Sequence, residues 1–211
     1  ILFTNDPDID RVLFLNALIE MNHRGPDSPG GYQFYNNHQL GHNRLKIIDI
    51  DDRNNQPFTS SNGKYDIIFN GEIYNFKELA KEYDLKLKTK SDTEVLLELY
   101  IKLGPSMLNK LNGMFSLLIL NKETFELFIA RDRLGIKPLY YTNYKGFMTV
   151  SSEIAPLISL YGFSKPDEIG IRQYLKLRAF FNGRTYLQKI AYNNFKDNSE
   201  LYKKFLIKKT Y

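Results

Sequence analysis

The chain of 211 residues is 43% hydrophobic and 25% charged, a composition that is typical of folded globular proteins and excludes a disordered chain. It contains no cysteine, which excludes disulfides and thiolate metal sites within these residues, and its longest apolar run is much shorter than the roughly 20 residues of a membrane span. The net charge of +5 comes from residues 165–211, where 11 Lys and Arg face four Asp and Glu. We interpret this basic segment as a solvated flank, because no nucleic-acid motif accompanies it, and we expect a cytoplasmic protein without a metal site.

The first fifty residues predict a strand, a helix, a hairpin and a second strand. Residues 1–4 form a short apolar run before the turn signal Asn-Asp-Pro, which is typical of a buried strand. Asp10 is placed to cap a helix that runs to about residue 21. Glycines and prolines predict a loop over residues 23–31. Residues 33–40 then predict a hairpin, and residues 45–50 predict a further strand.

The middle of the chain predicts one strand between two turns and then two helices. A turn at Asn62-Gly63 leads into a strand over residues 65–69, and Asn70-Gly71 predicts another turn directly after it. A helix is expected over residues 76–83. A second one begins with Ser91 or Asp92 as its cap and ends at Gly104-Pro105.

The remainder predicts strands followed by helices. Four strands are expected, over residues 115–120, 127–130, 139–142 and 147–151, and two helices over residues 152–161 and 167–180. Because strands and helices are grouped and do not strictly alternate, we predict an α+β fold of antiparallel sheets with helices packed on them.

Three segments place polar residues where packing does not require them. Arg44 lies directly beside the apolar strand predicted over residues 45–50, where its guanidinium either forks onto a carboxylate or lies on the surface. Asn70 and the Gly71 amide offer two donors that suit an oxyanion hole, although Asn-Gly is foremost a turn dipeptide. Asp92 is either a helix cap, the favoured role when it is taken alone, or an anion that receives an ammonium group. Together they suggest a pocket for a free amino acid whose side-chain carbonyl is attacked.

A series of longer motifs covers nearly all of residues 1–160. They are Arg24-Gly-Pro-Asp27, Gly41-His-Asn-Arg44-Leu-Lys-Ile-Ile-Asp49, Asn70-Gly-Glu-Ile-Tyr-Asn75, Ser91-Asp-Thr-Glu94, Leu111-Asn-Gly-Met-Phe115, Ala130-Arg-Asp-Arg-Leu-Gly-Ile-Lys-Pro-Leu-Tyr140 and Ser152-Glu-Ile154. In content and order they resemble the class II glutamine amidotransferases of the asparagine synthetase type. The resemblance implies an N-terminal nucleophile hydrolase fold, a four-layer αββα sandwich of two antiparallel sheets.

The resemblance also implies the chemistry and the residues that carry it. In the family an N-terminal cysteine attacks glutamine, and its own α-amine, with a pKa of ~8, serves as the base. Asn70 and the Gly71 amide would stabilise the oxyanion, and Arg44 would hold the α-carboxylate. Asp92, helped by Glu72, would receive the α-ammonium. Three apolar residues would line the pocket: Leu45, Ile47 and Ile48.

Other parts of the motifs have two interpretations. Arg24, Asp27 and residues 131–140 either shape the pocket wall and the ammonia exit or have a structural role, which is at least as well supported.

Both ends of the chain depart from the family pattern. The family reads Met-Cys-Gly where this chain starts at Ile1, so we expect the catalytic cysteine just upstream; the alternative is a non-catalytic homologue that binds glutamine or a partner protein. The family continues into an ATP-using synthetase domain, whose Ser-Gly-Gly-x-Asp-Ser loop does not occur here. We therefore expect a glutaminase domain over residues 1–160 and a linker-like basic extension over residues 161–211, which includes a short helix over residues 193–211.

The expected partners follow from the same resemblance. They are L-glutamine, a synthetase domain or subunit that receives ammonia, and a second copy in a homodimer. We expect no cofactor in this domain, with ATP and Mg²⁺ confined to the synthetase. The chain is then either a fragment or a stand-alone glutaminase subunit.

Overall fold

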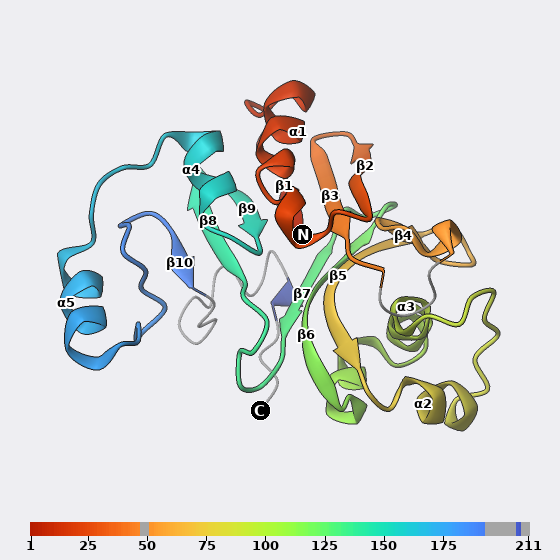
Figure 1. Cartoon of the computed structure of the whole chain (residues 1–211). Helices are drawn as coiled ribbons and strands as arrows, with labels where there is room; N and C mark the ends of the chain where they lie inside the picture. The colour runs from red at the N-terminus through yellow and green to blue at the C-terminus, as the bar shows by residue number, and fades with distance from the viewer. Residues whose placement is uncertain (47–50, 193–205, 208–211) are drawn as a thin grey trace.

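The computed structural model describes residues 1–46, 51–192 and 206–207, and its strands form two sheets that face each other (Figure 1). The first sheet has the order β10-β8-β9-β1-β3-β2, and every neighbouring pair in it is antiparallel. Its strands are β1 (Leu2–Thr4), β2 (Ser28–Tyr35), β3 (His38–Arg44), β8 (Tyr140–Tyr144), β9 (Phe147–Ser151) and β10 (Ala191–Tyr192).

The second sheet has the order β11-β7-β6-β5-β4. Its strands are β4 (Phe58–Thr59), β5 (Tyr65–Ile73), β6 (Gly113–Asn121), β7 (Leu127–Arg131) and β11 (Leu206–Ile207). All neighbouring pairs are antiparallel except β11 and β7, which run parallel.

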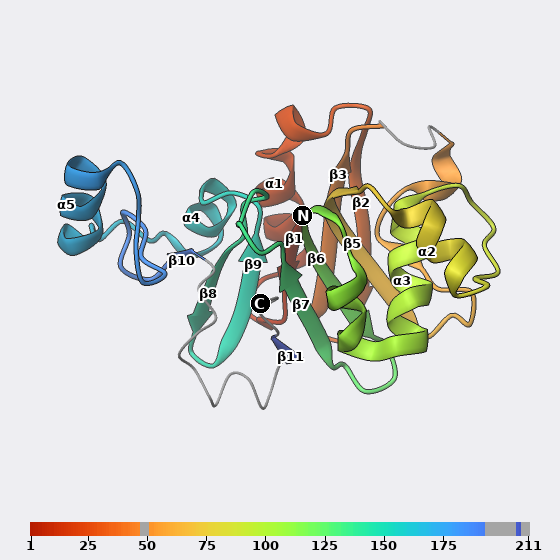
Figure 2. The same cartoon turned by 90° about the horizontal axis from the view of Figure 1, so that it is seen from below.

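Helices cover the outer faces of both sheets (Figures 1 and 2). Helix α1 (Arg11–Ile19) and helix α4 (Ala155–Tyr161) lie on the first sheet, whereas α2 (Phe76–Glu82) and α3 (Asp92–Leu103) lie on the second. Helix α5 (Glu168–Leu177) lies beyond α4 at one end of the molecule (Figure 2). Three short 3₁₀ helices complete the described elements: η1 (Asn22–Arg24), η2 (Asp52–Asn54) and η3 (Gly104–Lys110).

Alternation along the strands separates the layers. In β5, Ile68 packs between the two sheets, while Ile67 and Phe69 pack against the α3 side. Phe3 likewise faces the core between the sheets, and Leu2 packs with α1. Since successive strand residues point to opposite faces, this pattern produces three apolar layers between four layers of structure. The predicted αββα sandwich is confirmed.

Most predicted elements are found, and their caps follow the sequence signals. The Asp10 side chain accepts a hydrogen bond from the Leu13 amide at 2.8 Å and begins α1. Ser91, and not Asp92, caps α3 by accepting from the Glu94 amide at 3.2 Å. Among the described residues, no helix is both long enough and apolar enough to cross a membrane.

The predicted turn at Asn70-Gly71 is wrong, because both residues lie inside β5 and pair with Ser116 and Phe115 of β6. Gly71 is needed there for close approach and not for a turn. A Cβ atom on it would lie 2.2 Å from the Met114 carbonyl oxygen, so β6 could not approach any larger residue at this position.

Three other segments also differ from their predictions. Strand β2 begins at Ser28, inside the predicted loop, with a register irregularity between Ser28 and Gly31. Residues 45–46 are not a strand, because the Lys46 amide donates to Asp27 Oδ2 at 2.9 Å and the chain leaves the sheet after Arg44. Residues 206–207 form β11 on the edge of β7 and do not belong to a helix. The rest of that predicted helix lies outside the described residues, and the domain boundary at residue 160 stays a prediction.

Candidate active site

A cavity of about 230 Å³ opens between the end of β3, the middle of β5 and the start of α3. Six of the eight residues that the sequence assigned to a site line it: Arg44, Leu45, Asn70, Gly71, Glu72 and Asp92. The other two, Ile47 and Ile48, lie outside the described residues. The structure thus brings residues from three separate segments of the chain to one cavity, and the roles assigned to them stay predictions.

Arg44 is the last residue of β3 and is only 6% exposed. Its Nη1 donates to the Asp51 carbonyl oxygen at 2.9 Å and to Asn55 Oδ1 at 3.1 Å. These bonds hold the guanidinium against the loop of residues 51–55. The alternative of a surface arginine is therefore wrong, and Arg44 contributes positive charge to the cavity wall.

Asp92 is the first residue of α3 and is 5% exposed. Its Oδ2 accepts a hydrogen bond from the Ile73 amide at 3.1 Å. Burial raises the pKa of this carboxyl to about 6; the Ile73 amide acts in the opposite direction, and the nearby Glu72 raises it further. A carboxylate with a raised pKa gains most from a bound cation, which suits an ammonium site.

Asn70 lies next to the start of the chain. Its Nδ2 donates to Ser152 Oγ at 3.4 Å, and the nitrogen of Ile1 donates to the same oxygen at 3.1 Å. Ser152 is buried directly after β9, and its own amide donates to the Ile1 carbonyl oxygen at 3.0 Å. One hydroxyl therefore connects the first strand to the amide of Asn70.

His42 is a buried cavity residue that the sequence did not assign to the site. Its Nε2 is 3.0 Å from the Phe69 carbonyl oxygen, so the ring must carry its proton there to donate to that acceptor. Burial lowers its pKa to about 3, and the ring stays neutral near pH 7. Its Nδ1 has no hydrogen-bond partner within the described part of the chain. The available signal for this position was its place in the motif Gly41-His-Asn-Arg44, two residues before Arg44.

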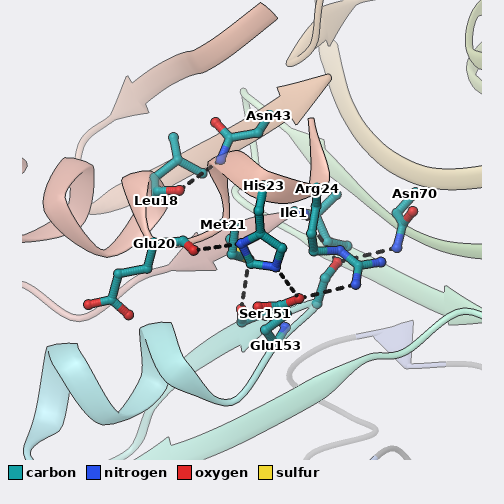
Figure 3. Close-up of polar contacts among 11 residues, drawn as sticks. Ile1, Leu18, Glu20, Met21, His23, Arg24, Asn43, Asn70, Ser151 and Glu153 are labelled. Carbon is teal, nitrogen blue, oxygen red and sulfur yellow. Dashed lines mark hydrogen bonds and ion pairs between the residues drawn. The ribbon is translucent and has the colours of Figure 1, made fainter. Parts of the chain in front are cut away.

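The Arg24-Gly-Pro-Asp27 motif divides between two roles. Arg24 lines the cavity, and its Nη1 is 3.1 Å from Glu153 Oε1, the oxygen that His23 also contacts (Figure 3). Asp27 does not line the cavity and instead binds the Lys46 amide.

Within residues 131–140, Lys137 reaches the cavity. Asp132 accepts from the amides of Leu134, Ile136 and Lys137 at 3.1, 2.9 and 3.0 Å. Arg131 Nε donates to the Lys137 carbonyl oxygen at 2.5 Å. This segment is thus a hydrogen-bonded loop that presents one lysine to the cavity.

Comparisons with other proteins show the family of the chain. The family model described as a glutamine amidotransferase domain matches residues 3–209. The chain is 42% identical over 160 residues to asparagine synthetase [glutamine-hydrolyzing] 1 of Bacillus subtilis, covering 74% of this chain and 25% of the relative. It is 35% identical over 190 residues to asparagine synthetase B [glutamine-hydrolyzing] of Escherichia coli, covering 86% and 33%. The chain thus spans a quarter to a third of these two relatives.

A solved structure shares the fold. The glutamine phosphoribosylpyrophosphate amidotransferase of B. subtilis superposes with a TM-score of 0.62 at 21% sequence identity, over 76% of this chain and 43% of that one. At this level of identity the likeness concerns the fold alone.

Proposed function

The chain belongs to the class II glutamine amidotransferase domains of the asparagine synthetase family, and we propose that it hydrolyses L-glutamine to L-glutamate and ammonia. The ammonia would serve an asparagine synthetase-like amide-forming reaction in a synthetase domain or a partner subunit. The observation that carries this proposal is that one cavity is lined by Arg44, Asp92 and Asn70. These three residues match the polar groups of glutamine. Arg44 would bind its α-carboxylate, Asp92 its α-ammonium, and Asn70 the oxyanion formed at its side-chain carbonyl.

The proposed nucleophile is a cysteine two residues before Ile1. The register of β1 and β3 pairs Leu2 with Gly41 and Phe3 with Leu40. If the same antiparallel register continues upstream, the residue two positions before Ile1 would lie opposite Arg44, at the cavity. The buried Ile1 nitrogen supports this direction, because it already meets the hydroxyl that Asn70 contacts.

In the proposed reaction the cysteine thiolate attacks the side-chain carbonyl carbon of glutamine, after its proton has passed to the α-amine of the same residue. Asn70 Nδ2 and the Gly71 N–H would donate to the oxyanion that develops. The α-amine would return a proton to the departing ammonia, and water would then cleave the thioester to release glutamate. Each step uses only protein groups, including the proposed upstream cysteine, and water, so we propose no cofactor for this domain and assign ATP and Mg²⁺ to the synthetase.

Three proteins test the proposal in one assay of glutamate release. The chain as printed should be inactive, because it has no thiol. The chain preceded by Met-Cys-Gly, produced in a host that removes the methionine, should release glutamate at a rate that rises as an α-amine loses its proton, near pH ~7–8.

The third protein keeps extra residues ahead of the cysteine. It should be nearly inactive, since its nitrogen is then a non-basic amide. Glutamine binding without glutamate release by the Met-Cys-Gly protein would support the non-catalytic alternative, and equal activity of all three would contradict the mechanism.

A further inference from the structure

Gln56 is a buried glutamine that contacts the neighbours in sequence of two of the three polar residues of the cavity. It is 7% exposed and lines the cavity. Its Oε1 accepts from the Phe69 amide at 2.5 Å, and its Nε2 donates to Thr93 Oγ1 at 3.4 Å. Phe69 directly precedes Asn70, and Thr93 directly follows Asp92. One side chain therefore connects the strand that carries the oxyanion donors to the helix start that carries the ammonium site.

The Phe69 peptide groups need such partners because strand β4 stops short of them. The β4–β5 ladder pairs Phe58 with Ile67 and ends there, so β4 gives no pairing to Phe69. On this side, Gln56 accepts from the Phe69 N–H while His42 donates to its carbonyl oxygen at 3.0 Å. Phe69 is 4% exposed, and buried backbone groups without partners are costly. Two side chains thus replace the missing strand beside the residue before Asn70.

The loop that carries Gln56 is itself fixed in place. Arg44 Nη1 donates to two oxygens of this loop, Oδ1 of the neighbouring Asn55 and the Asp51 carbonyl oxygen. On its other face, a Cβ atom on Gly31 would lie 1.9 Å from the Gln56 carbonyl oxygen, which shows how closely β2 presses on the loop. The loop of residues 51–57 therefore contacts the proposed carboxylate site directly and the other two sites through Gln56.

We propose that Gln56 is a positioning residue that sets the distance between the oxyanion donors at Asn70 and the ammonium site at Asp92. Bound glutamine has its α-ammonium at one of these points and its reacting carbonyl at the other. Gln56 thereby places the carbonyl against the donors when the ammonium is held. This inference rests on the proposed function and adds to it a residue that acts through Phe69 and Thr93.

The test compares Gln56→Met with a matched control on the same molecule. Methionine keeps the length of the side chain and removes both hydrogen bonds. Gln39→Met is the control, because it removes two hydrogen bonds of another buried glutamine that does not line the cavity. Gln39 is 2% exposed, donates to the Ile9 carbonyl oxygen at 2.6 Å and accepts from Tyr32 Oη at 3.1 Å. Both variants and the parent are measured for kcat and KM with Met-Cys-Gly ahead of Ile1, and for glutamine affinity by calorimetry on the chain as printed.

Gln56→Met should lower kcat about 10- to 100-fold, the range expected when reacting groups are misplaced by up to an ångström, and it should also weaken glutamine binding. Gln39→Met should leave both quantities within about twofold of the parent, even where both variants lose similar thermal stability. Thr93→Val breaks the connection to α3 alone, so it should weaken binding more than it lowers kcat. Unchanged kcat and affinity in Gln56→Met, or equal losses in Gln39→Met, would overturn the proposal.

A ligand-free measurement separates this inference from the proposed function. Amide hydrogen exchange at Phe69, followed by NMR, should be at least about tenfold faster in Gln56→Met than in the parent. It should stay slow in Gln56→Glu, which retains an acceptor. A parent that releases no glutamate would refute the proposed function, while equal exchange rates at Phe69 would refute the role of Gln56. If Gln56→Met does not fold, Thr93→Val still tests the connection to α3, and unchanged kcat and affinity in that variant would overturn the proposal.

Discussion

The Asp92 carboxylate should lower the stability of the empty protein and strengthen the binding of glutamine, and Asp92→Asn tests both effects. Burial raises its pKa from 3.8 to about 6. A carboxyl whose pKa is higher in the folded than in the unfolded chain stabilises the fold when the pH is below its unfolded pKa. This stabilisation is lost as the pH rises through the folded pKa. For Asp92 the loss falls between about pH 4 and pH 6. The difference between 3.8 and about 6 corresponds to about 3 kcal/mol of destabilisation of the empty protein at neutral pH.

Asparagine removes the charge and keeps an oxygen that can accept from the Ile73 amide. Asp92→Asn should therefore raise the free energy of unfolding by about 1–3 kcal/mol at pH 8 and have little effect at pH 4. Urea denaturation at both pH values measures this difference. Ser91→Ala is the matched control: it removes the α3 cap and should cost about 1 kcal/mol at both pH values.

The same substitution should weaken glutamine binding by roughly 2–5 kcal/mol, because the α-ammonium loses its charged partner. In the parent, the affinity measured by calorimetry should be about tenfold lower at pH 5 than at pH 8, since most of the Asp92 carboxyl is protonated one pH unit below its pKa. Asp92→Asn should abolish this pH dependence. A variant that is less stable at pH 8 would make Asp92 a structural residue, and unchanged affinity would remove it from the ammonium site.

Three further substitutions test the remaining parts of the cavity. Arg44→Ala should weaken glutamine binding by about 2–5 kcal/mol in calorimetry; unchanged affinity in folded protein would exclude a carboxylate contact. Asn70→Ala, with Met-Cys-Gly ahead of Ile1, should lower kcat by about 10²–10³ with little change in KM; a loss confined to KM would assign Asn70 to substrate binding. Gly71→Ala should lower the free energy of unfolding by about 1–3 kcal/mol or more, because its Cβ would meet the Met114 carbonyl oxygen of β6; denaturation with no such loss would show that β6 can move away.

The sequence predicts the layers of the fold well because they depend on local signals. The alternation of side chains along β5 and the Ser91 cap of α3 both depend on residues close together in the sequence. The turn at Asn70-Gly71 was wrong for a different reason. Glycine there serves the close approach of a strand more than forty residues away, as the pairing of Gly71 with Phe115 shows, and the local sequence contains no sign of that partner.

The same distinction explains which site residues were found. Arg44, Asn70 and Asp92 carry a charge or an amide of recognisable use, and the motifs around them provided a resemblance. Gln56 and Ser152 act only through contacts with residues 13 to 151 positions away. Their roles depend on where β4 ends and on where β9 meets the first strand. These are properties of the assembled sheets, which no single segment specifies.

The central place of β1 has a consequence for the proposed nucleophile. Because β1 lies between β3 and β9 and is hydrogen-bonded to both, the direction in which the chain leaves Ile1 is set on two sides. The proposed cysteine upstream of Ile1 would therefore lose little conformational entropy when it attacks the substrate, because folding has already restricted its backbone. By the same geometry, an affinity tag ahead of Ile1 would emerge at the cavity and block it.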